Sequence, residues 1–311
     1  MWIALVGGGV SAIASMAVGA GIPGGLLFLY MAPLPLLLVG LSLGASTVLV
    51  AGFAGIMVSG LLGGVLSAGM YAIVNAFPAW LVTRQMLSKR IGLEGAEQWR
   101  SLGPAIAWLS VMAAVFLIAG SLTVGDGKLG AEAAVTAFLS DAINAISPDL
   151  TDDMRLVFVE LLVPLYPGVV GASWVLMLVI NAALAQKILR NAKRNIRPSP
   201  TLATLKLPHW TSWALVGGAT TALLGAGELE YISRNLTIVL ATPFFFLGLA
   251  VVHYAADHVT FPGSLLAFFY FVLLVLFVSG WALLVVGIGM IEQWAGLRVR
   301  FSGPSNISGD E

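Results

Sequence analysis

The sequence has no cysteine and very few charged residues. None of its 311 residues is Cys, and Asp, Glu, Lys and Arg together make up 10%. The absence of cysteine excludes disulfides, thiolate nucleophiles and Cys-based metal sites. A soluble domain carries about 25% charged residues, so this chain lacks the charge needed to cover a surface in water. With 59% hydrophobic residues, the composition predicts an integral membrane protein.

Sequence signatures of catalysis are also missing. The chain has no H-E-x-x-H metal motif, no G-x-x-x-x-G-K-[ST] phosphate loop and no G-x-S-x-G nucleophile elbow. His253 and His258 flank Asp257, an arrangement open to metal binding or proton relay, but a solvated helix end is the more ordinary interpretation. No charged residue lies in the middle of a predicted apolar segment, which argues against proton pumping. We therefore expect no enzymatic activity, no cofactor, no metal and no nucleic-acid partner.

Long apolar runs are what the sequence has instead. A helix needs about 20 apolar residues to cross a membrane, and such runs recur along the chain. We expect an all-α polytopic membrane bundle with about nine apolar segments and eight to ten crossings. The count is open because the last segment, interrupted at Ser279-Gly280, is either one bent helix or a tight hairpin. The segments are 2–20, 25–43, 46–62, 65–87, 103–124, 168–190, 210–227, 235–255 and 263–292.

Basic residues gather in two loops and predict the orientation. Ten of the fifteen Lys and Arg residues lie in 84–100 and 187–206, and the positive-inside bias places both loops in the cytoplasm. Four crossings precede the first loop, so the N-terminus is expected in the cytoplasm as well. The side of the C-terminus stays open, because Arg298 and Arg300 lie outside after nine crossings but inside after a terminal hairpin.

The acidic connection between the fifth and sixth segments is expected to contain two amphipathic helices at the outer interface. In 129–147, polar residues recur every four positions between apolar ones, which places them on one stripe of a helix. Ser147-Pro148-Asp149 ends that helix, and Thr151 or Asp152 caps a second, shorter one. The polar stripe comprises Glu132, Thr136, Ser140 and Asn144.

Small residues form a ladder on the first segment. Gly7, Ser11, Ser15 and Gly19 follow one another at four-residue spacing, which puts them on one helix face. Small side chains let helix backbones approach closely in lipid. Two interpretations stay open: the ladder packs within the protein, or it faces outward and docks another membrane protein.

Polar residues inside apolar segments are candidates for function, because an unpaired polar group is costly to bury. The alternative is an interhelical hydrogen bond, or an ion pair such as Arg234 with Glu228 or Glu230. The residues that we single out for ligand binding are Asn75, Trp174, Asn181 and Asn235.

A family resemblance rests mainly on the C-terminal third. Its most specific stretches are 207–210, Asn235 with 243–249, and 287–294 followed by Arg298. Through these the chain resembles the YybS-like family of predicted bacterial membrane proteins, domain of unknown function 2232, although Met290-Ile291-Glu292 departs from the usual family ending. The resemblance implies the bacterial cytoplasmic (inner) membrane. That family is distantly similar to the substrate-binding membrane subunits of energy-coupling-factor transporters, which implies that the ladder on the first helix meets a coupling protein.

These observations divide the chain and suggest two functions. We expect a six-segment membrane domain at 1–190, a basic cytoplasmic linker at 191–209, C-terminal membrane segments at 210–296 and a polar tail at 297–311. The first hypothesis is binding of a small molecule or lipid between helices, within a transporter or outside one. The second is a membrane scaffold or assembly factor that holds a membrane subunit, a cytoplasmic partner or anionic lipid through basic residues. The linker cations proposed for that contact are Lys193, Arg194 and Arg197.

Overall fold

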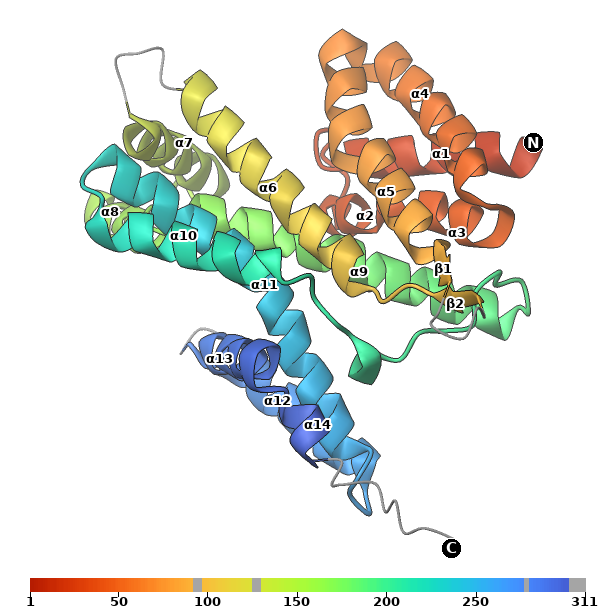
Figure 1. Cartoon of the computed structure of the whole chain (residues 1–311). Coiled ribbons are helices and arrows are strands. Elements are labelled where there is room, and N and C mark those ends of the chain that lie inside the picture. The colour runs from red at the N-terminus through yellow and green to blue at the C-terminus, as the bar shows by residue number, and fades with distance from the viewer. Residues whose placement is uncertain (92–96, 125–129, 277–279, 302–311) are drawn as a thin grey trace, which may run out of the picture. The chain divides into compact units, whose positions relative to one another are not determined.

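The computed structural model describes residues 1–91, 97–124, 130–276 and 280–301 (Figure 1). These residues are almost entirely helical, as predicted. The strands that they contain are β1 (Lys89–Ile91) and β2 (Glu97–Trp99), which pair antiparallel. The chain divides into two compact units: unit 1 holds Met1–Leu109 and Trp174–Pro200, and unit 2 holds Ser110–Ser173 and Thr201–Glu311. This division differs from the domain boundaries expected from the sequence. Those boundaries were drawn for functional parts and stay a prediction.

Unit 1 is built from the N-terminal helices together with parts of two longer ones. Helices α6 (Gly103–Val124) and α9 (Tyr166–Asn191) each contribute residues to both units. The helices that lie wholly in unit 1 are α1 (Trp2–Met16), α2 (Gly25–Met31), α3 (Pro33–Leu43), α4 (Ala45–Tyr71), the π-helix η1 (Ala72–Ala76) and α5 (Phe77–Met86).

Helix α4 folds back on itself at Gly64. This glycine has φ 79° and ψ −179°, a conformation that only glycine adopts readily. The two arms then run side by side, since the Ser59 and Ser67 hydroxyl oxygens lie 2.9 Å apart. A methyl group placed at Gly52 would lie 3.1 Å from the Cβ of Ala76. The turn falls between the predicted segments 46–62 and 65–87.

Close backbone contact holds α1 against α4. A methyl group at Gly8 would lie 1.9 Å from the carbonyl oxygen of Ala51, so only glycine permits this approach. Ala4 and Ala12, one turn to either side of Gly8, are fully buried. Helix packing in lipid depends on such small residues, and this face of α1 is therefore an internal packing face.

Unit 2 holds the remaining helices, and its amphipathic pair matches the prediction. Ser147 ends α7, and the Thr151 hydroxyl accepts a hydrogen bond from the Met154 N–H at 3.4 Å as the cap of α8. The elements are α7 (Ala131–Ile146), α8 (Asp152–Leu162), the short 3-10 helix η2 (Leu202–Thr204), α10 (Trp210–Leu224), α11 (Glu228–Ala256), α12 (Pro262–Val275), α13 (Trp281–Ala295) and α14 (Leu297–Phe301).

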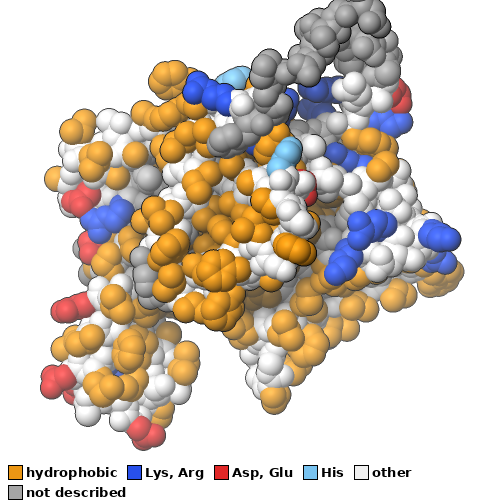
Figure 2. All heavy atoms as spheres, turned by 90° about the horizontal axis from the view of Figure 1, so that it is seen from below, with side chains coloured by type: hydrophobic (Ala, Val, Ile, Leu, Met, Phe, Trp, Pro, Cys, Tyr) orange, Lys and Arg blue, Asp and Glu red, His pale blue; other side chains and the backbone are white. Residues whose placement is uncertain are grey.

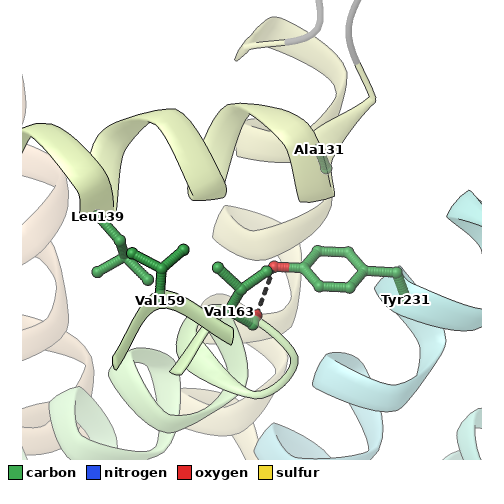
Figure 3. Close-up of a cluster of buried hydrophobic side chains, with 5 residues drawn as sticks. All are labelled: Ala131, Leu139, Val159, Val163 and Tyr231. Carbon is green, nitrogen blue, oxygen red and sulfur yellow. Dashed lines mark hydrogen bonds between the residues drawn. The ribbon is translucent and has the colours of Figure 1, made fainter. Parts of the chain in front are cut away.

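A buried apolar cluster joins α7, α8 and α11 (Figure 3). Leu139 of α7 lies close to Val159 of α8, and the Tyr231 hydroxyl donates to the Val163 carbonyl at 2.9 Å. The cluster buries the apolar face of the amphipathic α7. The outer-interface placement of α7 and α8 stays a prediction.

Two acidic residues at the start of α11 have different tasks. The Glu228 carboxylate accepts a hydrogen bond from the Ala131 N–H at 2.5 Å and so caps α7, where a negative charge is favourable. Glu230 instead pairs with Arg234 one turn along α11. Of the two ion pairs predicted for Arg234, the structure therefore selects Glu230.

The last predicted segment consists of two helices, α12 and α13. Gly280, with φ 84°, precedes α13, while Ser279 lies outside the described residues. Helix α13 packs on α11 through reciprocal glycine contacts. A methyl group at Gly248 would lie 1.9 Å from the Val285 carbonyl oxygen, and one at Gly289 would lie 1.9 Å from the Phe244 carbonyl oxygen.

Five helical runs among the described residues are long and apolar enough to cross a membrane. Three further apolar helices, α1, α12 and α13, are shorter than a full crossing, so the expected count of nine segments is not confirmed. Many large apolar side chains of the membrane-length helices are exposed, and Figure 2 shows wide hydrophobic areas on one face of the molecule. Such a surface suits lipid rather than water. The five runs are 25–43, 45–86, 103–123, 166–191 and 228–256.

Candidate functional site

Side chains from α1 and α9 donate to backbone carbonyls where α2 meets α3. The Ser11 hydroxyl donates to the Ala32 carbonyl at 2.6 Å and accepts from the Tyr71 hydroxyl at 2.8 Å. The Asn181 side chain donates to the Tyr30 carbonyl at 2.7 Å. This polar centre holds the junction in place inside an otherwise apolar unit.

Asn181 has one polar atom without a partner. Its Nδ2 donates to the carbonyls of Tyr30 and Met177, at 2.7 and 2.8 Å, so both N–H groups are used. If the amide were flipped, Oδ1 would face two carbonyl oxygens, both of them acceptors. The hydrogen bonds therefore determine which amide atom is the nitrogen and which is the oxygen. Oδ1 is buried and accepts no hydrogen bond from any described residue, and only 2% of Asn181 is exposed. A buried acceptor left alone costs about 1–3 kcal/mol.

Asn75 lies in the π-helix η1 and is buried as well. Pro78 has no N–H, so it cannot donate to the carbonyl of Val74, four residues earlier in the helix. The indole N–H of Trp174 donates to this carbonyl instead, at 3.2 Å. Single-turn π-helices occur frequently at functional sites, so this region of α9 and η1 is a candidate site.

Asn235, the fourth predicted ligand residue, is a structural clamp in unit 2. Its Oδ1 accepts from the Gly168 N–H at 2.8 Å, and its Nδ2 donates to the carbonyls of Pro164 and Tyr231 at 3.1 and 2.9 Å. These bonds tie α11 to the first turn of α9, to the turn before α9 and to itself. The structure thus places Asn75, Trp174 and Asn181 in unit 1 and Asn235 in unit 2.

The small-residue ladder is not one open face. Gly7 packs against α3, since a methyl group there would lie 2.8 Å from Val39 Cγ2, and Ser11 is fully buried. Ser15 is half-buried, and only Gly19, beyond the end of α1, is exposed. This arrangement favours packing within the protein at Gly7 and Ser11, and docking through the ladder stays a prediction.

Arg197 is buried, which the sequence did not indicate. Its guanidinium donates to the carbonyls of Met86 and Arg100, both at 2.8 Å, and lies 5.7 Å from the ring centre of Trp99. Burial lowers the pKa of this guanidinium from its ordinary value. These two donors are used within unit 1, which does not favour Arg197 as a contact for a partner or anionic lipid, and the role of the basic linker stays a prediction.

Gln186 and Glu292 are two further buried polar residues. Gln186 of α9 donates through Nε2 to the Arg197 carbonyl at 2.7 Å, and its Oε1 accepts from no described residue. Glu292 of α13 forms a buried ion pair with Arg298 at 2.8 Å. Arg298 also donates to the carbonyls of Ala203 and Leu205. Only the family-like ending of the sequence drew attention to Glu292 and Arg298.

The two histidines that flank Asp257 belong to unit 2. His253 Nε2 is 2.9 Å from the Tyr270 hydroxyl, and His258 Nδ1 is 2.8 Å from the Tyr254 carbonyl oxygen. Within the part of the chain that the structure describes, no group of three or more His, Asp or Glu side chains is arranged to hold a metal ion.

The match to a family model agrees with this architecture. A model described as a predicted membrane protein family, DUF2232, matches residues 10–291. No curated protein and no solved structure matches the chain. Since the family model covers most of the sequence and all five membrane-length helices, the chain belongs to the DUF2232 family of predicted membrane proteins.

Proposed function

We propose that this membrane protein binds a small molecule or lipid between the helices of unit 1, beside α9, α2 and η1. One observation carries the proposal: the Asn181 Oδ1 atom is buried and accepts no hydrogen bond from any described residue. A group that supplies an N–H or O–H donor there would offset the cost of its burial. The buried amide of Asn75 and the Trp174 indole are further members of the site.

The ligand chemistry follows from the acceptor. Asn181 presents an uncharged oxygen, so it favours a neutral hydroxyl, amide or amine N–H over an anion. Buried water is the competing occupant, because a polar site with enough partners holds one. A ligand and a water differ in mass, and this difference can be measured.

Native mass spectrometry of the protein, gently extracted from its own membrane, tests the proposal. The wild type is compared with Asn181→Leu and with a matched control, Asn191→Leu, at the exposed end of α9. We expect a bound small molecule or a specific lipid on the wild type and on the control, and its loss from Asn181→Leu. A wild type that carries only bulk lipid, or an adduct that survives Asn181→Leu, would refute the site.

A transporter role extends this proposal, and it rests on the distant resemblance to energy-coupling-factor subunits inferred from the sequence. The same spectra test it, because an added mass that matches an ATPase and a coupling subunit would support it. The second candidate is a scaffold or assembly factor without ligand, favoured by the exposed cations at the ends of α5 and α9. A protein that carries a partner protein and no small molecule would support the scaffold.

We further propose a bacterial cytoplasmic membrane location, with the N-terminus and both basic segments in the cytoplasm. The resemblance to bacterial proteins supports the location. The bias of basic loops toward the cytoplasm supports the orientation.

A further inference from the structure

Two basic segments that are distant in the sequence lie together in unit 1. Arg197 joins them, because its guanidinium donates to the carbonyl of Met86, at the end of α5, and to that of Arg100. The loop after α9 is thereby fixed beside the end of α5 and the end of β2. We define the exposed cations of these segments as the basic rim: Arg84, Lys89, Arg90, Arg100, Lys187, Arg190, Lys193 and Arg194.

The basic rim has little negative charge of its own. Lys89 pairs with Glu97 at 2.6 Å, and Glu97 is the only acidic residue in the described parts of 84–100 and 187–197. The other seven rim cations have no carboxylate partner among the described residues. Figure 2 shows Lys and Arg side chains as separate groups beside extensive hydrophobic areas. An anionic partner would therefore meet an uncompensated positive surface.

The position of the basic rim indicates which anionic partner fits. Met86 and Asn191 end two of the membrane-length helical runs, so the rim begins where apolar helix surface stops. Arg84 lies 5.3 Å from the ring centre of Trp80, and Lys89 lies 5.1 Å from that of Trp99. Tryptophan is enriched at the headgroup level of membranes, which places these cations at the depth of lipid phosphates.

We propose that the basic rim binds the headgroups of anionic phospholipids. Arginine suits this task because its guanidinium donates two parallel hydrogen bonds to a phosphate. Each Lys or Arg at a membrane surface strengthens retention of anionic lipid roughly fivefold. This surface is separate from the proposed ligand site at Asn181 and does not depend on it.

Lipid retention by the whole protein tests the proposal. The protein is reconstituted in nanodiscs of equal parts phosphatidylglycerol and phosphatidylcholine, released, and its retained lipids are counted by native mass spectrometry. The rim variant is Arg190→Gln with Arg194→Gln. The matched control, Arg234→Gln with Arg300→Gln, removes two arginines of unit 2. In nanodiscs both leaflets have the same composition, so an altered membrane orientation does not affect the comparison.

We expect the wild type and the control to retain phosphatidylglycerol in preference to phosphatidylcholine. In the rim variant this preference should be lower by on the order of tenfold. The preference should weaken with added salt, as screening requires, which tests the proposal even where a variant folds poorly. Equal retention of the two lipids by the wild type would overturn the proposal. So would a rim variant that keeps the preference, displacement of lipid by millimolar inorganic phosphate, or an acidic protein that replaces lipid on the rim.

Discussion

Arg197 Nη1 donates to the Met86 carbonyl oxygen at 2.8 Å, across 111 residues of sequence. The guanidinium has no carboxylate partner among the residues that the structure describes, and it donates to backbone carbonyls instead. It brings the end of α9 to the end of α5 within unit 1. Much of the proposed lipid surface depends on this one side chain.

Replacing Arg197 should destabilise unit 1. Arg197→Gln removes both long-range donors and leaves two carbonyls without them, so we expect a loss of about 2–4 kcal/mol and a lower Tm in detergent. Thermal unfolding of the purified protein measures the effect. Arg194→Gln is the control, because Arg194 is exposed, and it should shift the Tm little. Equal shifts in the two variants would contradict the role assigned to Arg197.

The lowered pKa of Arg197 predicts the pH response. Burial of a charged base with a lowered folded-state pKa opposes folding. The stability therefore rises with pH, but only in the pH range between the pKa of the folded protein and that of the unfolded protein. For Arg197 that window lies at strongly alkaline pH, so its contribution should be constant between about pH 6 and about pH 9. Arg197→Lys should instead gain stability toward alkaline pH, because a buried lysine loses its proton far more readily. A flat profile for Arg197→Lys would show that this position is not desolvated.

Neighbouring glycines in α1 should respond differently to alanine. Gly8→Ala places a methyl group against the Ala51 carbonyl and forces α1 away from α4, at a cost of about 1–3 kcal/mol. Gly9→Ala is the control, because the nearest atom to its added methyl group would be 4.0 Å away. The Tm values of the two variants provide the comparison. Similar values would show that α1 does not pack on α4 as described.

The buried pair of Glu292 and Arg298 should behave as a unit. Glu292→Leu leaves the Arg298 charge buried without its partner, which should cost about 3–5 kcal/mol. In the double variant with Arg298→Leu the charge is absent, so the loss should be smaller than the sum of the two single losses. Unfolding of the four proteins completes the cycle. Additive losses would mean that the two side chains do not interact.

The absence of native cysteine makes the orientation testable. We expect Asp141→Cys, on the exposed side of α7, to react with a membrane-impermeant maleimide in intact cells. Lys193→Cys should react only after the cells are opened. The reverse pattern would place the N-terminus outside the cytoplasm and contradict the orientation inferred from the basic loops.

Local and compositional rules predicted part of this structure. The low charge predicted membrane helices, and the capping rule gave Thr151 or Asp152 as the cap of α8, of which the structure uses Thr151. Long-range pairing could not be predicted, because Asn181 and Asn235 look alike as single amides in apolar segments. Only the fold shows that the amide of Asn235 is fully used, while Oδ1 of Asn181 accepts from no residue that the structure describes. The burial of Arg197 was missed for the same reason, since backbone carbonyls leave no trace in a sequence.

An experimental structure of the gently extracted protein, detailed enough to show atoms beside Asn181 Oδ1, tests the proposed function most directly. The proposal predicts a non-protein molecule larger than water that donates a hydrogen bond to this oxygen. The contrary result is an Asn181 side chain whose Oδ1 accepts from a protein group or from water alone. In that case Asn181 only joins α9 to α2, and the proposed binding site is not there.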